Sequence, residues 1–252
     1  ERANAAKTGF LSRMSHDIRT PLNGIIGMIE ISDRHREDRA LVDANRVKEK
    51  VAAKHLLELI NDVLEFNKLD EENLQLTKEP FCLKKLWQEI ITIVEPRAAD
   101  RGVRLTYEEQ TEGTAAGCVL GSSLHVRQIF INILGNAIKY TDAGGHVLCQ
   151  VTIKAIGESR ISCRAVISDN GIGMSTAFLP HLFESFSREN TDEKSVTQGT
   201  GLGMSIVKHL VDEMGGTITV ESKKGVGTTF TVTLLFEEPK EQEGKKIEEG
   251  DE

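Results

Sequence analysis

Apolar residues recur at intervals of three and four near the start of the chain, which is the spacing of one face of an α-helix. They predict a helix over residues 3–33, and these positions are Phe10, Met14, Ile18, Leu22, Ile25 and Ile29. Residues 33–39 are charged and aperiodic. A second helical stripe, of heptad type, follows through Ala52, Leu56, Leu59, Val63 and Phe66. Two helices joined by a short connection form an antiparallel hairpin.

A single hairpin cannot cover two stripes this apolar. Pairing with a second copy of the chain, into a dimeric four-helix bundle, covers both stripes. The alternative is that the hairpin packs onto the rest of the chain.

After residues 78–80 the pattern changes to short β-rich runs between helices. We predict helices at 83–100, 123–140 and 202–214, and strands at 103–108, 118–120, 146–156, 160–168, 217–222 and 228–236. This order predicts an α/β domain with a mixed sheet. The predicted organisation is a helical hairpin at 1–76, an α/β domain at 77–237 and a charged linker or tail at 238–252.

Charge and composition narrow the functional classes. The net charge of the 252 residues is −8, and residues 237–252 alone hold eight acids and three lysines. This acidity argues against nucleic acid as a main partner. No run of 18 apolar residues and no secretory signal pattern occurs, so we expect no membrane contact in this piece. The chain begins at Glu1 without an initiator methionine, as a fragment of a longer polypeptide would.

The four cysteines, Cys82, Cys118, Cys149 and Cys163, form no C-x-x-C pair. We therefore expect reduced thiols in a cytoplasmic protein, rather than disulfides or a zinc site.

A histidine lies inside the first predicted helix, in the segment Ser15-His16-Asp17-Ile18-Arg19-Thr20-Pro21. His16 falls off the apolar stripe, and Asp17 can accept the imidazole Nδ1 proton, which leaves Nε2 nucleophilic. Thr20 lies one turn beyond His16 on the same face. Taken alone, His16 is better interpreted as an ordinary surface histidine, and only the neighbouring motifs favour a catalytic role.

Two amides and a lysine share one face of the helix predicted at 123–140. Asn132, Asn136 and Lys139, followed by Tyr140, occur at offsets of four, seven and eight. Amides beside an apolar core need partners, and Mg²⁺ with phosphate oxygens would supply them. The alternative is a buried amide network.

Two glycine-rich segments follow predicted apolar elements. In Asp169-Asn-Gly171-Ile-Gly173 a carboxylate at a strand end can accept from the exocyclic amine of adenine, although a simple turn explains the segment better when it is taken alone. Gly199-Thr-Gly201-Leu-Gly203 precedes a helix and can direct N–H groups at phosphates. It matches neither the P-loop nor the dinucleotide pattern, so this signal is weak alone.

Taken together and in order, these segments resemble the motifs of the histidine kinase family across almost the whole chain. Residues 10–28 resemble the phosphoacceptor box, 132–141 the N box, 169–174 the first glycine box, 182–188 the F box and 199–216 the second glycine box. The resemblance implies a two-layer α/β sandwich that binds ATP and Mg²⁺. It also implies a dimer whose partner is the receiver domain of a response regulator. The phosphoacceptor box is similar to those of hybrid kinases, in which a receiver domain follows.

The resemblance also implies roles for individual residues. His16 would be phosphorylated, Asp17 would help it attack, and Thr20 would serve removal of phosphate from the regulator. Asn136 would bind Mg²⁺, with Asn132 nearby. The remaining expected contacts are Lys139 and Arg188 with phosphates, Tyr140 beside the nucleotide, Asp169, Gly171, Gly173 and Thr228 around the base, and Gly199, Gly201 and Gly203 at the end of a mobile ATP lid. Ser122 stands where the family commonly has aspartate, and it can still cap the following helix.

Two other functions remain open from the sequence. Gyrase-type and heat-shock chaperone ATPases share the ATP-binding boxes, but they lack a His16-like box and release phosphate to water. A non-catalytic dimeric scaffold would have a degenerate nucleotide site, against which the intact Asn136 and Asp169 argue.

Overall fold

The computed structural model describes residues 2–70, 76–112, 118–157, 159–189 and 201–239. In the two N-terminal helices, the side chains described are those of residues 18–54, 56, 57, 59 and 60. The chain divides into two compact units, residues 1–68 and 69–252, and each is described by itself.

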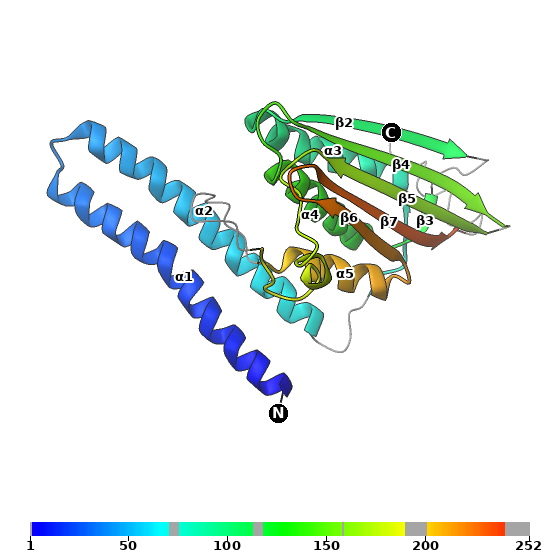
Figure 1. Cartoon of the computed structure of the whole chain (residues 1–252), viewed down its shortest axis with the longest axis horizontal. Coiled ribbons are helices and arrows are strands. Elements are labelled where there is room, and N and C mark those ends of the chain that lie inside the picture. Colours follow the sequence, from blue (N-terminus) through cyan, green and yellow to red (C-terminus); the bar gives the residue numbers. More distant parts are fainter. Residues whose placement is uncertain (1, 71–75, 113–117, 158, 190–200, 240–252) are drawn as a thin grey trace. The chain divides into compact units, whose positions relative to one another are not determined.

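The first unit is a helical hairpin of α1 (Arg2–Arg34) and α2 (Arg39–Asp70), as Figure 1 shows. The two predicted helices and their short connection are confirmed. Helix α1 continues through Pro21. Asp38 accepts a hydrogen bond from the Leu41 backbone N–H at 3.0 Å, so the charged connection ends in a side-chain cap for α2.

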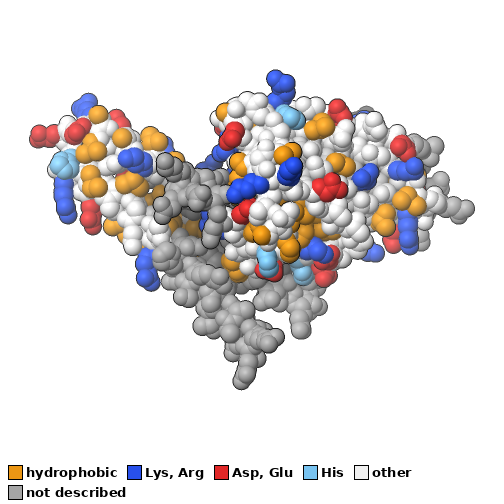
Figure 2. All heavy atoms as spheres, in the orientation of Figure 1, with side chains coloured by type: hydrophobic (Ala, Val, Ile, Leu, Met, Phe, Trp, Pro, Cys, Tyr) orange, Lys and Arg blue, Asp and Glu red, His pale blue; other side chains and the backbone are white. Residues whose placement is uncertain are grey.

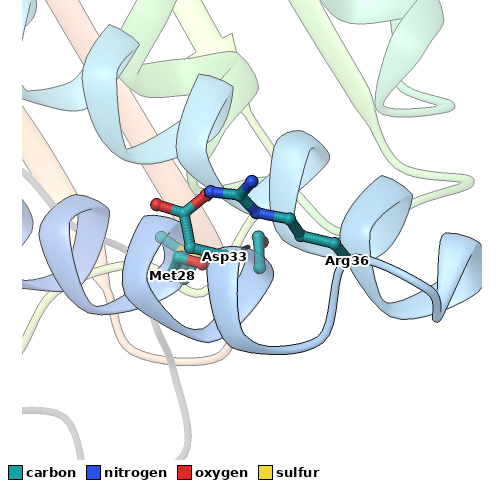
Figure 3. Close-up of polar contacts among 4 residues, drawn as sticks. Met28, Asp33 and Arg36 are labelled. Atoms are coloured by element: carbon teal, nitrogen blue, oxygen red, sulfur yellow. Dashed lines mark hydrogen bonds and ion pairs between the residues drawn. The ribbon is translucent and has the colours of Figure 1, made fainter.

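Polar contacts join the helices near the closed end of the hairpin. Asn45 of α2 is only 4% exposed, and its Nδ2 donates to Ser32 Oγ at 3.1 Å and to the Met28 carbonyl at 3.4 Å. Beside them, Arg36 folds back to pair with Asp33 at 3.1 Å (Figure 3). A buried amide in an apolar seam specifies which residues of the two helices face each other.

Both helices also leave large apolar side chains exposed, and on the face drawn in Figure 2 such side chains lie between charged ones on the hairpin. The most exposed of them are Leu22, Ile26, Ile29, Ile31, Val47, Val51 and Leu57. In the described part of the chain, no helix combines the length and apolar character needed to cross a membrane.

The second unit alternates strands and helices, and the predicted α/β domain with a mixed sheet is confirmed. Its elements are β1 (Glu79–Cys82), α3 (Leu83–Asp100), β2 (Arg104–Glu112), β3 (Cys118–Gly121), α4 (Ser123–Lys139), β4 (His146–Ile156), β5 (Arg160–Asp169), the short helix η1 (Leu179–His181), α5 (Gly203–Glu213), β6 (Thr217–Lys223) and β7 (Gly227–Glu237). Strand β1 and η1 were not predicted. Pro80 argues against a strand at 79–82, because proline within a sheet is largely confined to edge strands. Strand β1 is at the edge of the sheet, where Pro80 is tolerated.

The strands form one sheet in the order β1-β3-β7-β5-β4-β2, with β6 also paired to β7. Strands β2 and β4 pair in parallel, and the other described pairs are antiparallel. Helices α3, α4 and α5 lie on one face of this sheet (Figure 1). Alternate residues of β4, β5 and β7 are buried, which assigns one side of each strand to the helix-covered core.

The core between sheet and helices is built around aromatic and aliphatic side chains. Trp87 of α3 and Phe130 of α4 are fully buried, with ring centroids 4.3 Å apart. Burial of such rings anchors α4, which carries the predicted N box. All four cysteines are free thiols, and Cys149 and Cys163 are buried in the core.

Candidate functional site

Asp169, the last residue of β5, has one carboxylate oxygen tied to the backbone. Its Oδ1 accepts from the Gly171 N–H at 2.9 Å and from the Thr228 N–H at 3.2 Å. Both bonds end on Oδ1, so Oδ2 keeps its acceptor capacity for another group. Burial raises the pKa of Asp169 and outweighs the opposing effect of the two N–H donors. The site therefore holds an oriented, partly desolvated hydrogen-bond acceptor.

The two glycines after Asp169 are required by close backbone contacts. A Cβ on Gly171 would lie 2.2 Å from the Tyr140 carbonyl oxygen. Gly173 has φ +60°, and a Cβ there would lie 2.1 Å from the Lys223 carbonyl oxygen. The sequence suggested that these glycines admit a ligand, whereas the approach seen here is to the chain's own backbone. They lock the loop after β5 onto the end of α4 and onto the β6–β7 turn.

Helix α4 presents the amides predicted from their spacing. Asn132 Nδ2 donates to the Gln128 carbonyl at 3.1 Å, and its Oδ1 is 3.2 Å from where a Gly203 Cβ would be. Within the described part of the chain, the half-buried Asn136 side chain has no hydrogen-bond partner. A half-buried amide that has no protein partner and is open to solvent can take an ion or a polar substrate as its partner.

Basic and aromatic groups gather at the C-terminal end of α4. Lys139 Nζ lies 5.1 Å from the centroid of the Tyr140 ring. Burial raises the pKa of Tyr140, and the positive charge of Arg188 acts in the opposite direction. The Lys139 cation beside the ring, the charge of Arg188 and the Asn136 amide one turn earlier on α4 suit an anionic ligand that carries a flat ring.

The F box meets the second glycine box at Phe186 and Gly201. The Phe186 N–H donates to the Gly201 carbonyl at 2.9 Å, and both residues have positive φ, +67° and +72°. Phe186 is the one non-glycine residue with positive φ in the described backbone. Gly203 begins α5 against Asn132, while Gly199 and residues 190–200 of the predicted lid lie outside the described residues.

The predicted phosphoacceptor residues belong to the other unit. His16, Asp17 and Thr20 lie within helix α1. The side chains of His16 and Asp17 lie outside the described residues, and Thr20 is exposed.

One expectation about the start of α4 needs correction. Ser122 does occupy the N-cap position, but its hydroxyl makes no capping bond to the first turn. The hydroxyl instead lies 2.7 Å from His125 Nδ1 and accepts from Thr77 Oγ1 at 3.2 Å. The nearby imidazole competes for the hydroxyl, and so the cap predicted from residue type alone is not formed.

Sequence reasoning missed two residues that shape the site. Phe186 was not assigned a contact, although an aromatic residue in a polar, glycine-flanked loop is a signal for one. Ser222 contacts Met174, Gly227 and Thr228 through its hydroxyl. Its signal is subtler, because it depends on knowing which strands pair.

The donor set also bears on a metal. The described residues contain no cluster of three or more His, Cys, Asp or Glu side chains suited to hold an ion. Mg²⁺ is commonly held by one or two protein oxygens together with substrate phosphates. The solvent-accessible Asn136 amide fits that pattern, and the described residues offer no all-protein cage.

Comparison with protein families gives two matches. Residues 6–72 match the His Kinase A (phospho-acceptor) domain. Residues 121–238 match the histidine kinase-, DNA gyrase B- and HSP90-like ATPase domain. The first match contains His16, and the second contains Asn136, Asp169 and Thr228.

Similar proteins cover nearly the whole chain. The autoinducer 2 sensor kinase/phosphatase LuxQ of Vibrio parahaemolyticus is 34% identical over 93% of this chain and 27% of its own length. The sensor protein GacS of Pseudomonas syringae pv. syringae is 35% identical over 97% of this chain and 26% of its own length. The chain thus spans about a quarter of the length of these curated relatives.

Two solved structures share the fold. Full-length ShkA in complex with AMPPNP is 30% identical, with a TM-score of 0.64 over 91% of this chain and 46% of that one. Histidine kinase ThkA in complex with the response regulator protein TrrA is 22% identical, with a TM-score of 0.68 over 93% of this chain and 64% of that one. At that identity the second comparison shows the fold alone.

Proposed function

Since the chain belongs to the histidine kinase family, with a phospho-acceptor domain followed by an ATPase domain, we propose that it phosphorylates its own His16 from ATP. The observation that carries the proposal is that one polypeptide holds both a candidate acceptor, within residues 6–72, and an oriented purine acceptor at Asp169. A protein that only binds nucleotide would need the purine acceptor at Asp169 but not the phosphoacceptor histidine.

Nucleotide binding follows from the polarity of the site. Asp169 Oδ2 accepts from the exocyclic amine of adenine, while Oδ1 stays bonded to Gly171 and Thr228. Tyr140 lies beside the nucleotide, and Lys139 and Arg188 supply positive charge for the phosphates. The complex of the 30% identical ShkA with AMPPNP supports a nucleotide in this fold.

Mg²⁺ is the metal that this arrangement would hold, through the Asn136 amide oxygen with Asn132 nearby. When bound, it would offset the charge of the phosphates. The residues of the chain do the positioning: the amides orient the phosphates, and the glycine-rich backbone ahead of α5 approaches them.

Phosphoryl transfer then balances simply. Neutral His16 attacks the γ-phosphorus through Nε2, a P–N bond forms, and the bond from that phosphorus to the β–γ bridging oxygen breaks, releasing ADP. Asp17 accepts the Nδ1 proton and stabilises the imidazolium that develops. Rate enhancement comes mainly from holding the two groups in line.

We place the second step on a receiver domain of a response regulator, whose aspartate takes the phosphoryl group from His16. The match of residues 6–72 to a phospho-acceptor domain supports a phosphoryl group held on this hairpin for onward transfer. Thr20, exposed on α1 one turn from His16, would orient a water for hydrolysis of the regulator's aspartyl phosphate. The relative LuxQ is named a kinase/phosphatase, which supports that second activity.

We also propose that the hairpin pairs with a second copy. The exposed apolar side chains on both of its helices are the surface that a four-helix bundle would cover. Because the reaction uses ATP, we place this part of the chain in the cytoplasm.

Incubation with γ-labelled ATP tests the central claim. We expect label that is acid-labile and base-stable, absent from His16→Ala and retained in His35→Ala, which removes an exposed histidine elsewhere on the hairpin. Free phosphate without labelled protein would instead indicate an ATPase of the gyrase or chaperone type. No nucleotide binding at all would indicate a scaffold.

A further inference from the structure

Ser222 joins three parts of the candidate base site through one hydroxyl. The Met174 N–H donates to its Oγ at 2.8 Å, its Oγ donates to the Gly227 carbonyl at 3.0 Å, and its Oγ lies 2.9 Å from Thr228 Oγ1. None of the family motifs in the sequence includes this serine.

Strand register explains why Ser222 is there. Asp169 of β5 is paired with Thr228 of β7, and Thr228 is paired with Ser222 of β6. Residues paired across neighbouring strands point to the same face of a sheet. Thr228 is 8% exposed and alternates with the buried Phe230 and Val232, so the row lies on the helix-covered face. The three adjacent strands can be followed in Figure 1.

The protons of this row can be assigned by counting. A hydroxyl has one donor and two acceptor positions. Ser222 gives its one proton to the Gly227 carbonyl, which can only accept, and it receives a proton from the Met174 N–H. When all three bonds form at once, the remaining lone pair can only accept, and the Thr228 hydroxyl then donates to Ser222.

This assignment determines what the site offers to a base. With its proton held by Ser222, Thr228 Oγ1 presents only lone pairs, as does Asp169 Oδ2. Both acceptors can take the two N–H protons of the amino group of a 6-amino purine, directly or through a water. They oppose a 6-oxo purine, whose oxygen would face lone pairs.

We propose that Ser222 is a positioning and specificity-determining residue, which holds the Thr228 hydroxyl as an acceptor and so selects adenine over 6-oxo purine nucleotides. The proposal rests on the base site assigned above to Asp169. Without the Ser222 hydroxyl, Thr228 is released to turn and donate its proton to a 6-oxo group.

The test is calorimetric binding of ADP and inosine diphosphate to the whole chain and its variants. For Ser222→Ala we expect ADP to bind about fivefold more weakly, the effect of one hydrogen bond, and inosine diphosphate to bind no more weakly. The ADP preference therefore falls about fivefold or more. Ser222→Thr keeps a hydroxyl and should restore the preference.

Ser168→Ala is the matched control. It removes another cross-strand hydroxyl pair, Ser168 Oγ to Thr229 Oγ1 at 2.9 Å, one residue from the row. We expect it to keep the wild-type preference. Thr228→Val should lower the preference as Ser222→Ala does, and the double variant should lower it no further, because both changes remove the same acceptor.

An unchanged preference in Ser222→Ala, or an equal weakening of both nucleotides, would overturn the proposal. So would additive losses in the double variant. If the Ser222→Ala protein melts early, Thr228→Val measured alone keeps the test decisive, because an unchanged preference in that variant also overturns the proposal. Failure of the proposed nucleotide site gives a different result. In that case the wild-type chain would bind neither nucleotide, or Asp169→Asn would bind ADP as tightly as the wild type.

Discussion

Gly173→Ala tests the contact that closes the loop after β5 onto the β6–β7 turn. Gly173 has φ +60°, and an added Cβ would lie 2.1 Å from the Lys223 carbonyl oxygen and 3.1 Å from the Gly227 carbonyl oxygen. These neighbours are backbone atoms, so no flexible side chain can move aside. Either the loop or the turn must shift.

The size of the effect follows from what the shift breaks. Alanine in left-handed backbone costs about 1 to 2 kcal/mol, and overpacking adds about 1 to 3 kcal/mol. The Gly225 N–H bond to the Ile172 carbonyl, 2.7 Å, and the Met174 bond to Ser222, 2.8 Å, would also be strained. After the small gain from a stiffer unfolded chain, we expect a loss of about 3 to 5 kcal/mol in free energy of unfolding. In a domain of this size that lowers Tm by roughly 10 °C.

Gly157→Ala is the control, because Gly157 also has positive φ, +67°, but an added Cβ would meet nothing within 4 Å. It should lose only about 1 kcal/mol, the conformational part. Thermal unfolding and ADP calorimetry on both variants separate strain from collision. We expect ADP affinity to fall more than tenfold in Gly173→Ala and to stay at the wild-type value in Gly157→Ala. Equal melting temperatures and equal ADP affinities in the two variants would show that the close approach to Lys223 does not exist.

Three other outcomes follow from the proposed function. His16→Ala should abolish protein labelling yet bind ADP as the wild type does, since the two functions lie in different domains; retained label would remove His16 from its role. Burial raises the pKa of the Asp169 carboxyl in the folded chain above its value in the unfolded chain. Its contribution to the free energy of unfolding is therefore fully present below the unfolded pKa and is lost as the pH rises through the folded pKa. Asp169→Asn should therefore lose ADP binding at neutral pH without lowering Tm, and a clear fall in Tm there would contradict the sign. Thr20→Ala should keep autophosphorylation but release phosphate from a phospho-regulator about 10² to 10³ times more slowly, and an equal fall in both rates would instead indicate a distorted helix.

The sequence predicted the elements well where periodicity is long or strict. The two hairpin helices, the α4 and α5 helices and strands β4 to β7 follow from their 3.6- and two-residue patterns. It could not predict β1, because four residues containing Pro80 have too little pattern, and their strand state depends on pairing with β3. Asn136 and Asp169 could be chosen as candidate site residues because both chemistry and spacing mark them, and their binding roles stay predictions.

Contacts across the sheet were beyond the sequence. Nothing local says that Asp169, Thr228 and Ser222 occupy one row, since that depends on the β5–β7 and β6–β7 register. Likewise, from the sequence Gly171 and Gly173 were interpreted as making room for a ligand. In the structure, the close approach of neighbouring backbone requires glycine at both positions. Residue type predicts which chemistry a side chain can perform, but strand pairing decides which side chains lie together in one site.

The bond from the Thr228 N–H to Asp169 spans 59 residues of chain, whereas β4 and β5 are joined by a short turn. Closing so long a loop carries an entropic cost before any contact rewards it, so we expect β7 to dock late in folding. Bound nucleotide should then slow unfolding while leaving the folding rate unchanged, because its contacts form after the barrier. A nascent chain released before β7 would have no base site, and nucleotide occupancy would thus distinguish a finished domain from an incomplete one.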